Sequence, residues 1–170
     1  MIPARPIPER KRRRGRTGSA LIEMAVGWFI ITTVFGAAFE YGYIFYQYNS
    51  LFNAVNNGAR YASMYPYDTN SPTYSDNFKH SVQDIVLYGD PTGSSSTLVL
   101  RNLKTSNITI TVTGTGDSSG TPNTWSPTQM TVAIATDTNG YAIDGVFGTF
   151  TFKGKPTVTY PFVGNYTGNQ

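Results

Sequence analysis

The sequence contains no cysteine, a single histidine and few charged residues. Without Cys the chain can form neither a disulfide framework nor a thiolate metal site, although an oxidising destination remains possible. His80 has no second His or Cys to complete a metal site or a catalytic triad, so we expect it at the surface. Paired carboxylates, a phosphate-binding loop and a dinucleotide fingerprint are also missing. We therefore expect no enzyme activity, no metal site and no cofactor.

The positive charge of the chain is confined to its N-terminal end. Residues 1–18 hold seven bases and one acid, a net charge of +6, whereas the other residues together carry −3. The first 17 residues contain three prolines and no apolar periodicity, which is typical of a disordered, solvated arm. A nucleic-acid-binding protein should carry its bases on the folded domain. We therefore expect no nucleic-acid partner.

A long apolar run follows the basic arm. Residues 19–39 contain one charge, Glu23, and residues 24–39 contain none. As a helix, this run is about 30 Å long, enough to cross the hydrocarbon core of a bilayer. The chain behind it has too little apolar surface to wrap a helix that is hydrophobic on all sides. Because bases precede the run, the positive-inside rule leaves the N-terminus in the cytoplasm and the rest outside.

The helical pattern continues beyond the apolar run. Over residues 40–64 the apolar side chains recur every three or four positions, which predicts an amphipathic helix. Pro66 disfavours helical backbone at Tyr65 and should end the element. The sequence thus predicts one helix over residues 19–64, with a membrane-spanning first half and an amphipathic second half.

The last part of the chain, residues 65–170, has the composition of a small β-rich head. A cap at Ser75 or Asp76 predicts a short helix to about Tyr88. Alternation of β-branched or aromatic residues with Thr and Ala predicts half-buried strands in an antiparallel sheet. These strands are expected near residues 108–113, 130–135, 150–152 and 158–162, with loops at 114–127 and 139–145. A fragment of about residues 66–170 is expected to be soluble and β-rich.

One loop has a faint similarity to a calcium-binding loop. Residues 137–144 offer oxygen ligands but lack the acidic residue that such loops carry at their twelfth position. A turn at Asn139-Gly140 is the better interpretation.

The junction between arm and helix resembles the processing site of type IV prepilins. Residues 16–23 read Arg-Thr-Gly-Ser-Ala-Leu-Ile-Glu, so Glu23 is the fifth residue after Gly18. The resemblance implies a cleaved leader over residues 1–18, cut between Gly18 and Ser19 by a prepilin peptidase. It also implies that Glu23 pairs with the new amine of Ser19 during assembly. A carboxylate inside hydrocarbon is costly and usually marks function.

A second resemblance extends over the helix. Glu40-Tyr41-Gly42, followed by residues 53–62 (Asn-Ala-Val-Asn-Asn-Gly-Ala-Arg-Tyr-Ala), is similar to the signature of the TadE/TadG-like pseudopilins of the tight-adherence (Flp) pilus. That family commonly has Ala-Arg-Glu where this chain has Val55-Asn56-Asn57, so a charged pair is missing. The resemblance implies an α+β, pilin-like fold and an inner-membrane subunit that packs against other pilin-like subunits through its helix.

Small and aromatic residues of the helix are the candidates for that packing, because small residues let helix backbones approach closely. They are Gly27, Gly36, Tyr41, Gly42, Phe45, Tyr48, Phe52 and Gly58. Glu40 is expected near the outer membrane interface in contact with water, so its replacement should matter less than that of Glu23.

Three functions remain open at this stage. The first is a structural or assembly subunit of a Tad-type pilus or secretion system, and the second is the major subunit of an extracellular filament. The third is a secreted binding protein whose signal peptide is cut before Phe39, after the small residues Gly36-Ala37-Ala38. The first residue of the mature protein separates the pilin-like functions (Ser19) from the secreted one (Phe39).

Overall fold

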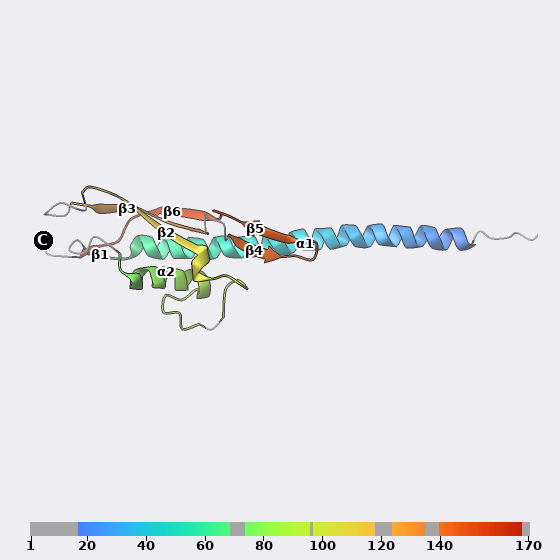
Figure 1. The fold of residues 1–170 in the computed structure, drawn as a ribbon, viewed down its shortest axis with the longest axis horizontal. Helices are drawn as coiled ribbons and strands as arrows, with labels where there is room; N and C mark the ends of the chain where they lie inside the picture. Colours follow the sequence, from blue (N-terminus) through green and yellow to red (C-terminus); the bar gives the residue numbers. More distant parts are fainter. Residues whose placement is uncertain (1–16, 69–73, 96, 118–123, 135–139, 168–170) are drawn as a thin grey trace, which may run out of the picture. The chain divides into compact units, whose positions relative to one another are not determined.

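The structure is a computed structural model that describes residues 17–68, 74–95, 97–117, 124–134 and 140–167 (Figure 1). The arm of residues 1–16 lies outside the described residues. In chain order the elements are α1 (Thr17–Met64), β1 (Tyr67–Asp68), α2 (Asp76–Tyr88), the 3₁₀ turn η1 (Thr105–Asn107), β2 (Ile108–Thr115), β3 (Ser126–Ile134), β4 (Tyr141–Asp144), β5 (Thr149–Phe152), β6 (Thr157–Pro161) and β7 (Tyr166–Thr167). The predicted α+β fold, with a long N-terminal helix, a short helix and a small antiparallel sheet, is confirmed.

Helix α1 has 48 residues and ends where the sequence predicts. Its last turn closes with the Tyr65 amide donating to the Ala62 carbonyl at 3.3 Å, one residue before Pro66. The chain forms two compact units, Met1–Phe39 and Glu40–Gln170. The second half of α1 therefore belongs to the same compact unit as the strands.

Helix α2 is fixed by caps at both ends. The Ser75 hydroxyl accepts a hydrogen bond from the Phe78 amide at 3.3 Å, as expected of an N-cap residue. At the other end Gly89 has φ 75° and its amide donates to the Ile85 carbonyl, a left-handed C-cap that favours glycine. The predicted apolar face, which contains Phe78 and Val82, is buried.

The largest sheet has the order β2-β3-β6 and is antiparallel throughout. Val132 of the central strand lies between Ile110 of β2 and Val158 of β6. On the opposite face the hydroxyls of Thr131 and Thr159 are 2.8 Å apart. Pro161 ends the edge strand β6, where its missing amide does not interrupt the sheet.

The predicted loop over residues 139–145 is wrong. Residues 141–144 form β4, which pairs antiparallel with β5. Tyr141 and Ile143 are buried while Ala142 and Asp144 are exposed, a period-two pattern too short to stand out in the sequence. The first residues of the calcium-like pattern, 137–139, lie outside the described residues.

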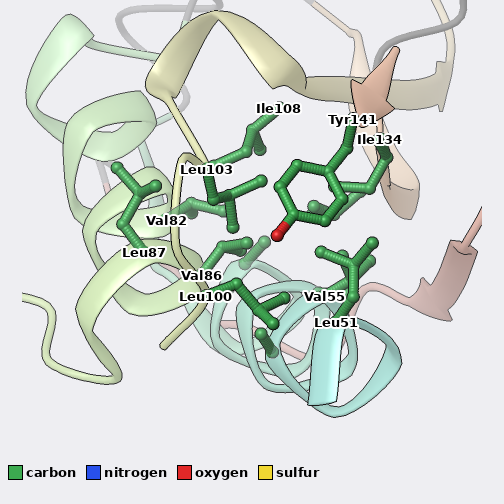
Figure 2. Close-up of a cluster of buried hydrophobic side chains, with 14 of the residues drawn as sticks. Leu51, Val55, Val82, Val86, Leu87, Leu100, Leu103, Ile108, Ile134 and Tyr141 are labelled. Carbon is green, nitrogen blue, oxygen red and sulfur yellow. The ribbon is translucent and has the colours of Figure 1, made fainter. Parts of the chain in front are cut away.

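The hydrophobic core lies between the second half of α1, helix α2 and the strands (Figures 1 and 2). Leu51 and Val55 of α1 point into the same cluster as Val82 and Val86 of α2 (Figure 2). Leu87 of α2 is also labelled, and the other labelled members come from the segment after α2 and from the strands: Leu100, Leu103, Ile108, Ile134 and Tyr141. The amphipathic half of α1 is thus the central element of the folded unit, not a stalk attached to it.

Candidate functional site

The predicted processing site lies in the first turn of α1. Gly18 and Ser19 are both exposed, and a Cβ on Gly18 would meet no atom within 4 Å. A protease needs extended backbone, and the ends of helices unfold locally at little cost. Both residues of the predicted processing site are therefore exposed among the described residues, at the end of a helix.

Glu23 lies one helical turn after Ser19, on the same face of α1. Its side chain is exposed, and it forms no ion pair with any residue that the structure describes. In the uncleaved chain the Ser19 nitrogen is an amide and carries no charge. An amine at Ser19 would arise only by cleavage.

The apolar half of α1 exposes its side chains. Among the described residues, one helix, Gly18–Met64, is long and apolar enough to cross a membrane. Its most apolar window of 18 residues has a mean hydropathy of 1.8, and no residue of that window is buried. Thr32 and Thr33 satisfy their hydroxyls by donating to the carbonyls of Trp28 and Phe29 at 2.8 Å. This leaves few unsatisfied polar groups, as a lipid environment requires.

Glu40 is not exposed to water, contrary to the expectation from sequence. Its side chain is 6% exposed, and each carboxylate oxygen lies 3.0 Å from the Phe147 amide that donates to it. Phe147 belongs to the turn between β4 and β5, which is closed by the Gly145 amide donating to the Gly148 carbonyl at 2.9 Å. A Cβ on Gly145 would collide with the Glu40 carboxylate, so a larger residue there would have to displace that carboxylate.

The aromatic residues predicted to pack between helices divide into two groups. Tyr41, Phe45 and Phe52 are 72%, 67% and 42% exposed and follow one face of α1. Tyr48 instead packs on Phe152 of β5, with ring centroids 5.2 Å apart. Three of the four predicted aromatic residues therefore form a surface that is available to a partner, which we call the aromatic stripe (Tyr41, Phe45 and Phe52).

The glycines predicted for helix packing also differ in their surroundings. A Cβ on Gly27 or Gly42 would meet no atom within 4 Å, so both leave room for a neighbouring helix. Gly36 is partly exposed. Gly58 is buried against α2, where a Cβ would collide with the Val86 side chain. Gly58 therefore serves packing of α1 on α2 within the chain.

Asn56, one of the residues that depart from the family signature, has a contact that the sequence did not reveal. Its side-chain oxygen accepts a hydrogen bond from the Tyr160 hydroxyl at 2.9 Å, joining α1 to strand β6.

The burial of Glu40 had a signal in the sequence. Glu40 lies four residues before Ile44 and eight before Tyr48, on the face of α1 that packs inward.

The residues that the structure describes contain no group of three or more His, Cys, Asp or Glu side chains that could hold a metal ion. The exposed features of the site are instead apolar and lie along one helix. Such a surface suits lipid or another helix.

The comparisons with known proteins match this part of the chain. The family model described as TadE-like protein matches residues 18–60, from the predicted cleavage site to the end of the Gly58-Ala59-Arg60 motif. No curated protein and no solved structure matches the chain. TadE-like proteins form a structural, pilus-related family, and a long apolar N-terminal helix is compatible with a membrane-anchored pilus component. The chain therefore carries a TadE-like segment over residues 18–60, which supports, in general terms, a pilin-like subunit associated with the Tad pilus.

Proposed function

We propose that this protein is a pilin-like subunit that is inserted into the inner membrane by residues 19–39 and assembled by packing of α1 against other pilin-like subunits. The observation that carries the proposal is the apolar window of α1, which has no buried residue although the folded unit has a core of its own. A helix of this length and composition, exposed on all sides, needs lipid or other helices around it.

In this proposal, residues 1–18 are a leader that holds the N-terminus in the cytoplasm until a prepilin peptidase cuts after Gly18. The exposed Gly18–Ser19 bond supports this step. Residues 40–170 lie outside the cytoplasm, and the subunit remains in the inner membrane or enters an extracellular filament.

Helix packing is assigned to the residues of α1 that have open space around them. Gly27 and Gly42 leave room for a neighbouring backbone, and the aromatic stripe offers large apolar side chains beside Gly42. In lipid, such small residues permit close approach and large ones supply dispersion contacts.

One observation favours a second function, that of a secreted binding protein. The compact unit begins at Glu40, so cleavage before Phe39 would release it whole. Such a protein would leave the aromatic stripe exposed to water, which makes this function the weaker one.

The first residue of the mature protein tests the proposal. We expect mass spectrometry of the membrane or filament fraction to give Ser19, and Gly18→Leu to block the cleavage and keep the subunit in the inner membrane. Phe39 as the first residue would establish the secreted protein instead. Normal maturation of Gly18→Leu would refute the leader assignment.

A further inference from the structure

The turn between β4 and β5 presents two large apolar side chains to the surroundings. Val146 is 86% and Phe147 is 66% exposed, and Phe150, just beyond the turn, is 41% exposed. From Gly145 to Phe152 the sequence contains no charged residue. A short turn in water normally carries polar residues, so this composition calls for an apolar or interfacial environment.

The turn is held at a defined position on α1. Its Phe147 amide donates to both carboxylate oxygens of Glu40 at 3.0 Å, and Gly145 is in close contact with the same carboxylate. Glu40 directly follows the uncharged run of residues 24–39. The two apolar side chains of the turn are therefore tied to the residue at which the proposed membrane span ends.

Helix α1 carries one further exposed aromatic residue within the two turns after Phe39, outside the aromatic stripe. It is Tyr46, which is 69% exposed. Tyrosines are enriched at membrane–water interfaces because the ring is apolar and the hydroxyl reaches water.

We propose that Val146 and Phe147, together with Tyr46 of α1, form an interfacial anchor that inserts into the headgroup region of the lipid bilayer. Glu40 is the positioning residue, because its carboxylate fixes the turn on the helix. The inference rests on the proposed membrane insertion of residues 19–39. It adds that the folded unit itself touches the bilayer, through a segment more than 100 residues further along the chain.

A lipid surface suits this patch better than a second protein subunit. The patch combines the apolar side chains of Val146 and Phe147 with the Tyr46 hydroxyl, none of them charged. Glu40, which holds the turn, adjoins the proposed span. Interfacial segments bury their apolar side chains only as far as the boundary of headgroups and acyl chains.

The experiment uses the absence of cysteine from the chain. Single variants Val146→Cys and Phe147→Cys of the full chain are labelled with a polarity-sensitive fluorophore and reconstituted into phosphatidylcholine vesicles, with or without lipids that carry a quencher near the headgroup. We expect blue-shifted emission that these lipids quench. The control is Thr115→Cys, an exposed position on β2 that pairs with Ser126. It lies near Trp125 and Tyr67, at the end of the folded unit away from Glu40. Quenching should be absent there.

A third position separates this inference from the proposed function. Val34→Cys lies in the middle of the apolar run, and its label should be quenched by lipids with a quencher deep in the acyl region. If Val34 is quenched but positions 146 and 147 behave like position 115, the interfacial anchor is refuted and the membrane span stands. If Val34 is not quenched, the proposed insertion itself fails. A blue shift at 146 and 147 that depends on protein concentration and not on the quencher would show contact with a second copy, which overturns the lipid assignment.

The role of Glu40 is tested in the Phe147→Cys background. Glu40→Ala removes both acceptors of the Phe147 amide, and we expect loss of the lipid quenching at position 147 while quenching at Val34 is kept. Glu40→Gln retains one acceptor oxygen and should restore part of the signal. Equal quenching in all three backgrounds would contradict a positioning role for Glu40.

Discussion

At the scale of single residues, the two carboxylates of α1 have different surroundings. Glu23 is exposed within the apolar run and has no ion-pair partner among the described residues, whereas Glu40 is buried and accepts the Phe147 amide. An isolated charge in lipid is costly, and a charge that accepts backbone hydrogen bonds is not isolated. Of the two, Glu23 is therefore the carboxylate that needs a partner beyond the residues that the structure describes.

Glu23→Gln tests whether that partner is the Ser19 amine produced by cleavage. The variant keeps the shape of the side chain and removes its charge, so we expect normal cleavage, insertion and folding but poor incorporation into the assembly. The measurement is the amount of subunit in sheared filaments or cross-linked complexes relative to the membrane fraction.

The matched control for Glu23→Gln is Thr33→Val, a second loss of polarity in the same segment. Thr33 already satisfies its hydroxyl within the helix, so this variant should assemble like the native chain. Equal assembly of Glu23→Gln and the native chain would show that Glu23 is only a tolerated charge near the cytoplasmic face.

Tyr141 gives the folded unit a dependence on alkaline pH. Its hydroxyl donates to the Arg101 carbonyl at 2.8 Å. The pKa of Tyr141 is raised above the ordinary value of 10.0, mainly by burial and further by the charges of Tyr43 and Asp144. The folded state thus holds the phenol proton more tightly than the unfolded state. Its contribution to stability is complete below pH 10.0 and is lost as the pH rises above that value toward the raised pKa.

Tyr141→Phe is the variant that measures this contribution. At neutral pH it should lower the free energy of unfolding by about 1 kcal/mol, the usual net value of one hydrogen bond. It should also lose less stability than the native chain when the pH is raised from about 9 to about 11. Urea unfolding in detergent micelles at both pH values gives the free energy of unfolding of each protein. If the native chain and Tyr141→Phe lost equal stability at alkaline pH, the effect would belong to other groups.

At the scale of elements, the contact between α1 and α2 depends on one glycine. Gly58→Ala would drive a methyl group into the buried Val86 side chain, and we expect a loss of about 1–3 kcal/mol, as for other overpacked sites. Gly42→Ala is the matched control, because it lies on the same helix with no atom within 4 Å of the added carbon. It should gain up to about 1 kcal/mol of helix stability.

The two glycine variants are compared by their urea midpoints in micelles. If Gly58→Ala were as stable as Gly42→Ala, the close approach of α1 and α2 would not exist in solution. Assembly gives a second comparison, since Gly42→Ala fills space that we assign to a neighbouring subunit. It should assemble less well although it is more stable.

At the scale of the whole molecule, the folded unit includes half of the long helix. Leu51, Val55, Ala59 and Ala62 of α1 are all fully buried in the core. A fragment that starts at residue 66 would lose them together. Burial of a single Leu or Val side chain is worth about 1.5–3 kcal/mol, while a domain of this size has about 5–15 kcal/mol in total.

We therefore predict that residues 40–170 fold and residues 66–170 do not, in contrast to the expectation from the sequence alone. Near-ultraviolet circular dichroism and thermal unfolding of both fragments in mild detergent provide the test. Residues 40–170 should show a cooperative transition and fixed aromatic signals. A cooperative transition in residues 66–170 would mean that the strands and α2 form a sufficient core by themselves.

The sequence by itself determined the elements whose patterns are local and long. The apolar run and the three-to-four spacing after it predicted α1 to Met64, and the cap at Ser75 predicted α2. The strands β2, β3, β5 and β6 followed from alternation of Thr with apolar residues. Each of these signals depends on neighbours within a few positions of the chain, so no tertiary information was needed.

Only the tertiary structure decided which surfaces of α1 remain available. Tyr48 and Tyr41 look alike in the sequence, yet one packs on Phe152 and the other is exposed. Glu40 shares the inward-packing face of α1 with Ile44 and Tyr48, but its partner, Phe147, is 107 positions away and could not be identified from that spacing. Burial and hydrogen bonding of these side chains depend on contacts between distant segments, which no local pattern encodes.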